Sequence, residues 1–147
     1  MTHMDQALAQ ARHAFDNEEV PIGAVIVHAD GRVLAAEPNR MRALRDPTAH
    51  AEMQAIRTAC RLLGQERLVD CDLWVTLEPC PMCAAAISFA RVRRLYFGAS
   101  DPKSGGVEHG PRIFNQPTCH HAPEVYGGIA ATQAAALLEA FFVARRR

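Results

Sequence analysis

The sequence predicts a single α/β domain over residues 1–147, with a mixed β-sheet and helices on its faces. Three observations lead to this fold class. Segments with helical spacing of apolar residues alternate with short β-branched segments. Asp30-Gly31 separates two apolar runs in the manner of a hairpin turn. Strand, helix and strand follow one another between residues 71 and 99, a pattern that forms a right-handed parallel crossover.

The first third of the chain is expected to form a helix and the hairpin. Residues 1–19 are expected to be largely an amphipathic helix, because apolar residues recur along one stripe at Met4, Leu8, Ala11 and Phe15. Residues 20–28 and 32–37 are rich in β-branched and apolar residues and are expected to pair as antiparallel strands. A loop that starts at Pro38-Asn39 should follow the second strand.

The next helix is expected at residues 47–63. Asp46 can cap its start, Pro47 suits a first helical turn, and Gly64 can end it. The remaining strands are expected at residues 71–77, 93–99 and 124–126. The remaining helices are expected at residues 81–90 and 130–145. A long Gly/Pro/Ser loop should follow residue 99.

Composition places the chain among globular cytoplasmic proteins. Hydrophobic residues make up 49% and charged residues 22%, and no apolar run reaches the length of a membrane span. The first residues lack the basic start and apolar centre of a signal peptide. Five cysteines, an odd number, favour free thiols and a cytoplasmic location. The formal net charge is zero, so the overall charge does not indicate a polyanion partner.

Two short motifs suggest a metal site, namely His-Ala-Glu at residues 50–52 and Cys-Pro-Met-Cys at residues 80–83. Cys80 and Cys83 form a C-x-x-C pair at a strand-to-helix junction, where the helix N-terminus favours the thiolate. The pair alone is also compatible with a redox site or half of a four-cysteine zinc site. The redox alternative does not explain His50, and no second C-x-x-C completes a four-cysteine site; the remaining cysteines stand alone at Cys60, Cys71 and Cys119.

With His50 as the third ligand, the residues predict a catalytic zinc site. Three protein ligands leave a fourth tetrahedral position for a water or hydroxide. Glu52, two positions from His50, can then move protons if both residues lie at a helix end. The combination H-x-E and P-C-x-x-C is the signature of zinc-dependent nucleobase deaminases.

The chain resembles the bacterial tRNA-specific adenosine deaminases along almost its entire length. The resemblance rests on VPIGAV, Asn39-Arg40, DPTAHAE, VTLEPCPMC, FGASDPKSG and the terminal ALLEAFF…RRR. It implies a cytidine-deaminase-like three-layer α/β/α sandwich with a five-stranded mixed sheet. It also implies one zinc ion per chain, usually in a homodimer. In that dimer, contacts are expected at the alanine-rich helix of Ala84, Ala85 and Ala86.

The resemblance implies a tRNA anticodon loop as the substrate. Hydroxide would attack C6 of the wobble adenine while Glu52 passes a proton to N1; ammonia would leave and inosine would remain. Asn39 would hydrogen-bond the purine and the backbone of Ala51 would orient it, although Asn39 is equally compatible with a turn residue. Asp101 and Lys103 match the family's substrate-facing loop.

Further RNA contacts are predicted in the last helix. Phe141 and Phe142 are adjacent and cannot face the core equally, so one of them could contact RNA, and Phe141 is the candidate. Packing of both rings, within the monomer or against a partner, is the alternative that the sequence favours. Arg145, at the start of a run that ends at Arg147, is predicted to contact phosphates, and the alternative is helix capping.

Two other functions remain open at the level of sequence. A deaminase of a free base or nucleoside would use the same zinc motif, and a non-catalytic zinc-stabilised RNA-binding module is a more remote alternative. The latter would not need Glu52 and would close the fourth ligand position. A second metal site at Cys119, His120 and His121 has no supporting ligand spacing.

Overall fold

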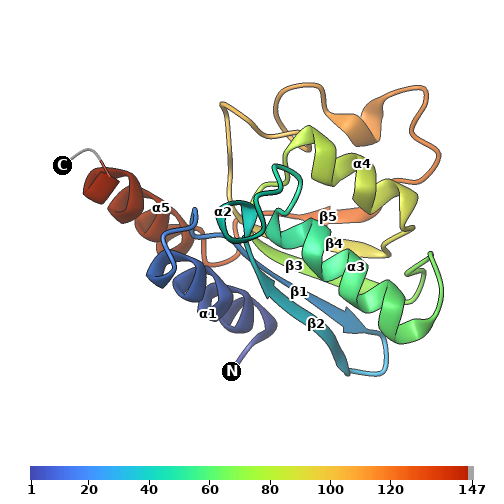
Figure 1. The fold of residues 1–147 in the computed structure, drawn as a ribbon. Coiled ribbons are helices and arrows are strands. Elements are labelled where there is room, and N and C mark those ends of the chain that lie inside the picture. The colour runs from blue at the N-terminus through green and yellow to red at the C-terminus, as the bar shows by residue number, and fades with distance from the viewer. Residues whose placement is uncertain (146–147) are drawn as a thin grey trace.

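The sheet has five strands in the order β2-β1-β3-β4-β5, as the computed structural model of residues 1–145 describes (Figure 1). The hairpin strands are β1 (Gly23–His28) and β2 (Val33–Pro38), and the others are β3 (Cys71–Leu77), β4 (Arg94–Ala99) and β5 (Glu124–Tyr126). β1 pairs antiparallel with β2 and β3, while β3, β4 and β5 run parallel. The predicted mixed sheet, hairpin and crossover are confirmed.

Helices cover both faces of the sheet and complete the three layers (Figure 1). The helices α3 (Ala51–Leu63) and α4 (Pro81–Phe89) pack on one face, and α1 (His3–Asp16) and α5 (Ala131–Arg145) pack on the other. Two short helices, α2 (Met41–Leu44) and the 3-10 helix η1 (Ile113–Asn115), lie in segments that the sequence predicted as loops. Among residues 1–145, no helix combines the length and the apolar character that crossing a bilayer requires.

The sheet is buried on both faces, which explains its apolar strands. Along β1, Ile26 belongs to the core beneath α3 and α4, whereas Val25 and Val27 belong to the core beneath α1. Successive side chains of a strand point to opposite faces, so a strand covered on both sides must be apolar throughout. The first strand is shorter than predicted and begins at Gly23, where the backbone of α1 approaches so closely that a Cβ would collide with Ala7.

The helix predicted at residues 47–63 begins four residues later, and the expected cap at Asp46 is wrong. Asp46 accepts hydrogen bonds from the Thr48 backbone at 2.8 Å and from the Thr48 hydroxyl at 2.7 Å. The Ala49 carbonyl accepts a hydrogen bond from the Arg40 amide, and these contacts hold residues 47–50 out of the helix. His50 is the N-cap residue instead, and Gly64 ends the helix with a positive φ, as predicted.

The carboxyl ends of β3 and β4 position the site. Leu77 at the end of β3 pairs with Ala99 at the end of β4, so the segments that follow them leave the sheet at the same edge. After β3 the chain passes through Glu78 and Cys80 into α4, and after β4 it enters the loop that starts at Ser100. Ligand sites of α/β sheets commonly lie at such an edge.

Candidate active site

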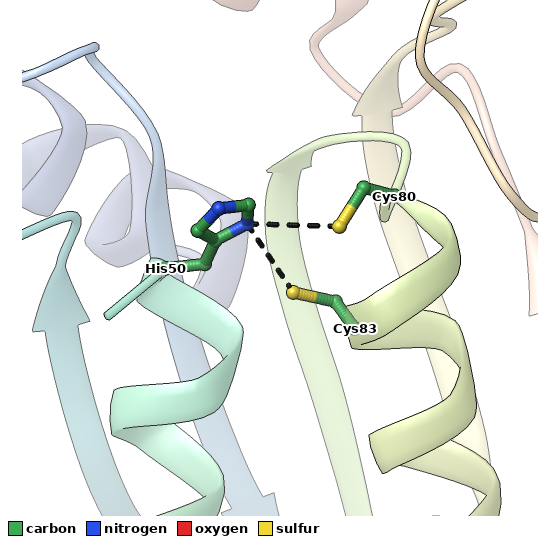
Figure 2. Close-up of side chains that lie close together, drawn as sticks. All are labelled: His50, Cys80 and Cys83. Atoms are coloured by element: carbon green, nitrogen blue, oxygen red, sulfur yellow. Dashed lines mark hydrogen bonds between the residues drawn. The ribbon is translucent and has the colours of Figure 1, made fainter. Parts of the chain in front are cut away.

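Two helix N-termini bring the predicted metal ligands together. His50 is the N-cap residue of α3, Cys80 is the N-cap residue of α4, and Cys83 lies in the first turn of α4. His50 Nδ1 lies 3.6 Å from Cys80 Sγ and 3.5 Å from Cys83 Sγ (Figure 2). Among the described residues, this is the group of His, Cys, Asp and Glu side chains whose geometry is able to hold a metal ion.

These separations fit tetrahedral zinc. With Zn–N of about 2.0–2.1 Å and Zn–S of about 2.3 Å, a tetrahedral angle places the nitrogen and sulfur about 3.6 Å apart. The observed 3.5 and 3.6 Å agree with that spacing, and all three ligand atoms lie within 4.8 Å of one another. One imidazole and two thiols form a set of N and S donors that suits zinc.

The two cysteines have opposite acidities, as expected for a thiol that stabilises a neighbouring thiolate. A hydrogen bond from Cys83 lowers the pKa of Cys80 to about 4, against the opposing effect of burial. The same interaction, together with burial, raises the pKa of the Cys83 thiol. The pKa of His50 is raised, chiefly by its hydrogen bond with Cys80. Cys80 is therefore the cysteine that more readily forms the thiolate that a cation binds, and Cys83 must lose its proton when a metal binds.

Glu52 lies in the first turn of α3 beside the ligands. Its residue surface is 4% exposed, and its Oε1 atom is buried without a hydrogen-bond partner. Burial raises the pKa of Glu52 to about 7, and a cation at the three ligands would lower it again. Burial and the cation thus act on this carboxyl group in opposite directions, and both act on the group that would serve as general acid and base.

His50, Glu52 and Cys80 line a cavity of about 710 Å³, which is within the usual size range of small-molecule sites. Four of the predicted substrate residues also line it, namely Asn39, Asp101, Lys103 and Arg145. The cavity draws its walls from segments far apart in the sequence; the other lining residues are Val20, Ile22, Met41, Leu77, Glu78, Ser100, Ser104, Leu138 and Phe142.

Asn39 presents a free polar atom in this cavity. Its Nδ2 donates to the Val20 carbonyl at 3.3 Å, and its Oδ1 is buried with no partner. A buried oxygen without a hydrogen bond is costly unless a ligand supplies one. Asn39 is thus not a turn residue whose hydrogen bonds are all satisfied, and its contact with the purine stays a prediction.

Phe141, the ring predicted to contact RNA, does not line the cavity, whereas its neighbour Phe142 does. Phe141 is 5% exposed and packs edge-on against Phe15 with ring centroids 5.8 Å apart, whereas Phe142 is 45% exposed. Adjacent helical residues point about 100° apart, so one ring faces the core when the other faces the cavity. The Arg145 guanidinium lies 5.1 Å from the centroid of the Phe141 ring, while Arg146 and Arg147 lie outside the described residues.

The Ala51 side chain is fully buried and does not line the cavity. Its backbone lies between His50 and Glu52 at the start of α3, so the predicted backbone contact with the base stays a prediction. Sequence reasoning missed Glu78, although an acidic residue directly after a buried strand and two positions before Cys80 is a signal that could have identified it.

The side chains of Cys119 and His121, in the segment Cys119-His120-His121, make hydrogen bonds within the chain. Cys119 donates a hydrogen bond to the His121 carbonyl at 3.1 Å, and His121 Nε2 lies 2.6 Å from the Val92 carbonyl oxygen. Within residues 1–145, Cys119, His120 and His121 do not belong to any group with metal-binding geometry. The second metal site receives no support.

Comparisons with known proteins agree with the geometry. Residues 1–99 match the family model of the cytidine and deoxycytidylate deaminase zinc-binding region. The chain is 62% identical to the tRNA-specific adenosine deaminase of Agrobacterium fabrum, over 99% of this chain and 95% of the relative. A solved structure from a study of A-to-I editing by tRNA:A34 deaminases at the wobble position is 63% identical, with a TM-score of 0.91 over 92% of this chain and 98% of that one.

A guanine deaminase of Bacillus subtilis with a solved structure is more distant. It is 31% identical, with a TM-score of 0.66 over 100% of this chain and 96% of that one. The same architecture therefore occurs in a solved structure that is named a guanine deaminase.

Proposed function

Because the chain belongs to the tRNA-specific adenosine deaminases of the cytidine deaminase-like superfamily, we propose that His50, Cys80 and Cys83 hold its zinc ion and that Glu52 moves the protons of the reaction. The enzyme hydrolyses adenosine to inosine at the wobble position of tRNA. The observation that carries the assignment of roles is the buried, unpaired Oε1 of Glu52 beside the three ligands at the cavity.

The zinc, when bound, supplies a hydroxide at neutral pH by lowering the pKa of a coordinated water. Glu52 takes the proton of the attacking water and delivers it to N1 of the adenine as the oxygen adds to C6. It then takes the proton of the new C6 hydroxyl and gives it to the departing amino nitrogen, so that the C6–N6 bond breaks, the C6 carbonyl of inosine forms and ammonia leaves. Glu52 is buried beside the ligands with one unpaired oxygen, so its carboxyl group lies where it can take up and release these protons.

The other cavity residues hold the substrate. Asn39 Oδ1 is an acceptor available to an N–H of the purine, and the Ala51 backbone orients the base. Asp101, Lys103 and Arg145 lie where the nucleotides beside the target base would pass. The exposed ring of Phe142 gives that path a stacking surface.

A comparison of substrates tests the function. The zinc-loaded enzyme is incubated with an anticodon stem-loop that contains adenosine at the wobble position, with the same stem-loop carrying guanosine there, and with free adenosine, guanine and cytosine. We expect inosine in the adenosine stem-loop at a kcat/KM at least a hundredfold above that of any free base or nucleoside. Faster turnover of free guanine would favour the guanine deaminase activity that the Bacillus subtilis structure represents.

The non-catalytic RNA-binding alternative is disfavoured by Glu52. A module that used zinc only for stability would gain nothing from a buried carboxyl group with an unpaired oxygen, which costs about 1–3 kcal/mol. Binding of the stem-loop without any inosine formation by the zinc-loaded protein would revive that alternative.

Residues 1–147 are proposed to act as one deaminase domain, as a homodimer in the cytoplasm. The single sheet with cores on both faces supports one domain. Ala84 is buried within the chain, but the outer face of α4 presents Ala85, Ala86 and the exposed ring of Phe89, which supports a contact between copies there. All five cysteines are free, which supports a reducing compartment.

A further inference from the structure

Glu78 is a buried carboxylate that binds almost exclusively backbone. Its side chain is 0% exposed, and it lies between the end of β3 and the zinc ligand Cys80. Its Oε1 accepts a hydrogen bond from the Asp101 amide at 3.0 Å and lies 2.8 Å from His109 Nδ1. Its Oε2 accepts from the amides of residues 107, 108 and 109 at 3.3, 3.0 and 3.1 Å.

These contacts draw the loop of residues 101–109 around one carboxylate. Gly105 lets the loop approach, because a Cβ there would collide with Glu78 Oε2. Gly106 donates to the Pro79 carbonyl at 2.8 Å, and a Cβ on it would come within 2.6 Å of Pro81. The loop is therefore packed directly against the segment that carries Cys80.

The other side of the same loop faces the cavity. Asp101, Lys103 and Ser104 line it, and Asp101 Oδ1 accepts from the amides of Lys103 and Ser104 at 3.2 and 3.0 Å. The link from Glu78 to Asp101 thus joins the metal-binding segment to the wall along which the substrate passes. Burial disfavours the charged carboxylate of Glu78, but the hydrogen bonds from Asp101, His109 and Glu108 lower its pKa overall.

We infer that Glu78, with His109 as its side-chain partner, is a positioning residue that fixes the substrate-facing wall at Asp101–Ser104 relative to the zinc ligand Cys80. The inference rests on the proposed function and adds a residue that acts through the loop and not on the reacting atoms. Because Glu78 holds this loop in place, its carboxylate sets the distance between RNA bound at the loop and the metal. Hydrogen bonds to a charged acceptor are stronger than neutral ones, so a single carboxylate can order a loop that lacks regular structure.

The first test needs no substrate. Glu78→Gln keeps the shape of the side chain but replaces one acceptor oxygen by an NH2 group, which cannot accept from the loop amides. In the zinc-loaded protein, we expect hydrogen exchange at the amides of residues 101 and 107–109 to accelerate at least tenfold, with one zinc per chain retained. Glu19→Gln is the matched control, since Glu19 is also buried and accepts from the amides of Arg42 and Ala43 at 3.0 and 2.8 Å. It should accelerate exchange at 42 and 43 and leave 101 and 107–109 protected.

The second test is kinetic. With the stem-loop, Glu78→Gln should raise KM roughly tenfold while kcat at saturation stays within about threefold, because the zinc and Glu52 keep their places. Gly105→Ala leaves the carboxylate intact but displaces the loop from it, and it should raise KM in the same way. If Glu78→Gln fails to fold, Gly105→Ala and His109→Ala carry the test, the latter with a smaller rise in KM.

Three outcomes would overturn the inference. They are unchanged exchange at residues 101 and 107–109, an unchanged KM in folded variants, and a loss of zinc with a fall in kcat alone, which would assign Glu78 to the metal site. If the wild-type protein forms no inosine, the proposed function fails, while the exchange measurement still decides whether Glu78 holds the loop.

Discussion

At the scale of single residues, the site is marked by polar atoms that the fold leaves unpaired. Within residues 1–145, the buried side-chain oxygens without a hydrogen bond are Asn39 Oδ1 and Glu52 Oε1, and both residues line the cavity. An unpaired buried polar atom costs about 1–3 kcal/mol. The fold bears that cost at the two positions where a substrate and its attacking water can supply the missing partner.

Glu52→Gln should separate proton transfer from metal binding. The amide has nearly the same shape but cannot carry a proton, so turnover of the stem-loop should fall by about 10²–10⁴-fold. Zinc content and Tm should stay close to wild type, because His50, Cys80 and Cys83 are unchanged. The measurements are single-turnover inosine formation and metal analysis of the same preparation. Near-normal turnover by the zinc-loaded variant would rule out the proposed mechanism.

Replacing either of the adjacent residues Phe141 and Phe142 of α5 by alanine should affect stability and substrate binding differently. Phe141→Ala removes a buried ring that packs on Phe15, and it should lower the free energy of unfolding by about 3–5 kcal/mol. Phe142→Ala removes a half-exposed ring at the cavity wall. It should change stability by less than about 1 kcal/mol and raise KM for the stem-loop. Chemical denaturation and steady-state kinetics of both variants check this, and equal stability losses would contradict it.

At the scale of elements, the site is built from two helix starts and the turns before them. α3 delivers His50 and Glu52, α4 delivers Cys80 and Cys83, and neither helix alone presents a complete ligand set. Positions i and i+2 diverge along a helix, yet His50 as N-cap residue and Glu52 in the first turn reach the same space beyond the terminus. A metal ion at these ligands therefore links the starts of two helices that are otherwise joined by packing and by the contacts of His50 with the two cysteines.

Removal of zinc should loosen this junction without unfolding the sheet. Binding to the folded state alone stabilises it by about 4 kcal/mol at a thousandfold excess over Kd, which corresponds to a fall in Tm of roughly 10 °C on chelation. Cys80→Ala and His50→Ala should lower Tm and lose metal together, while Cys119→Ser, at a cysteine outside the site, should do neither. Calorimetry with and without chelator is the measurement, and an identical Tm in both would contradict the assignment of the ligands.

The turn before α3 should make stability depend on pH in the acid range. Hydrogen bonds from the Thr48 hydroxyl and amide lower the pKa of Asp46 in the folded protein. The stability that the charged carboxylate contributes is present above its unfolded pKa of about 3.9, and it is lost as the pH falls through the lower folded value. Asp46→Asn should therefore be less stable than wild type at pH 7, with a difference that shrinks below about pH 4.

Urea midpoints at pH 7, 5 and 3.5 measure that difference. Thr48→Val removes the hydroxyl donor and should reduce the pH-dependent part of the difference while leaving the turn otherwise intact. A difference between wild type and Asp46→Asn that stays constant from pH 7 to 3.5 would show that the charge of Asp46 does not stabilise the turn.

At the scale of the whole molecule, the chain carries no formal net charge, and large apolar side chains are unevenly exposed on its surface. Its formal net charge is zero, so binding of RNA depends on local groups at the cavity and not on a long-range field. Among the large hydrophobic residues in the described helices and strands, Phe89 on α4 has the highest exposed fraction, 79%. Aromatic side chains are enriched in contact surfaces between proteins.

Phe89→Glu should convert the proposed homodimer into a monomer. A charge at the centre of an apolar contact between two identical helices would be desolvated and would face its own copy. Leu62→Glu on α3 is the control, because Leu62 is also a large exposed apolar residue but lies on another helix. Sedimentation at micromolar concentration should show a dimer for wild type and Leu62→Glu and a monomer for Phe89→Glu. A wild-type monomer would refute the proposed dimer.

Features with local physical signals could be predicted from the amino-acid sequence alone. Strands at 71–77 and 124–126 have the predicted bounds because period and flanking residues define a strand within its own length. The grouping of His50, Cys80 and Cys83 could be predicted because metal chemistry restricts the residue types and their spacing, and the structure brings these three side chains together. The predicted five-stranded mixed sheet followed from the resemblance that these motifs carry.

Tertiary structure decided what depends on contacts between distant segments. Asp46 and Pro47 have the residue types of a helix start, yet the turn at residues 46–49 and the bond from Arg40 to Ala49 keep residues 47–50 out of the helix, so α3 begins at Ala51. Spacing could not choose between Phe141 and Phe142, because the choice rests on Phe15, over 120 residues away. Glu78 is invisible to periodicity for the same reason: its amide partners lie more than 20 residues along the chain, and only folding brings them within hydrogen-bond distance.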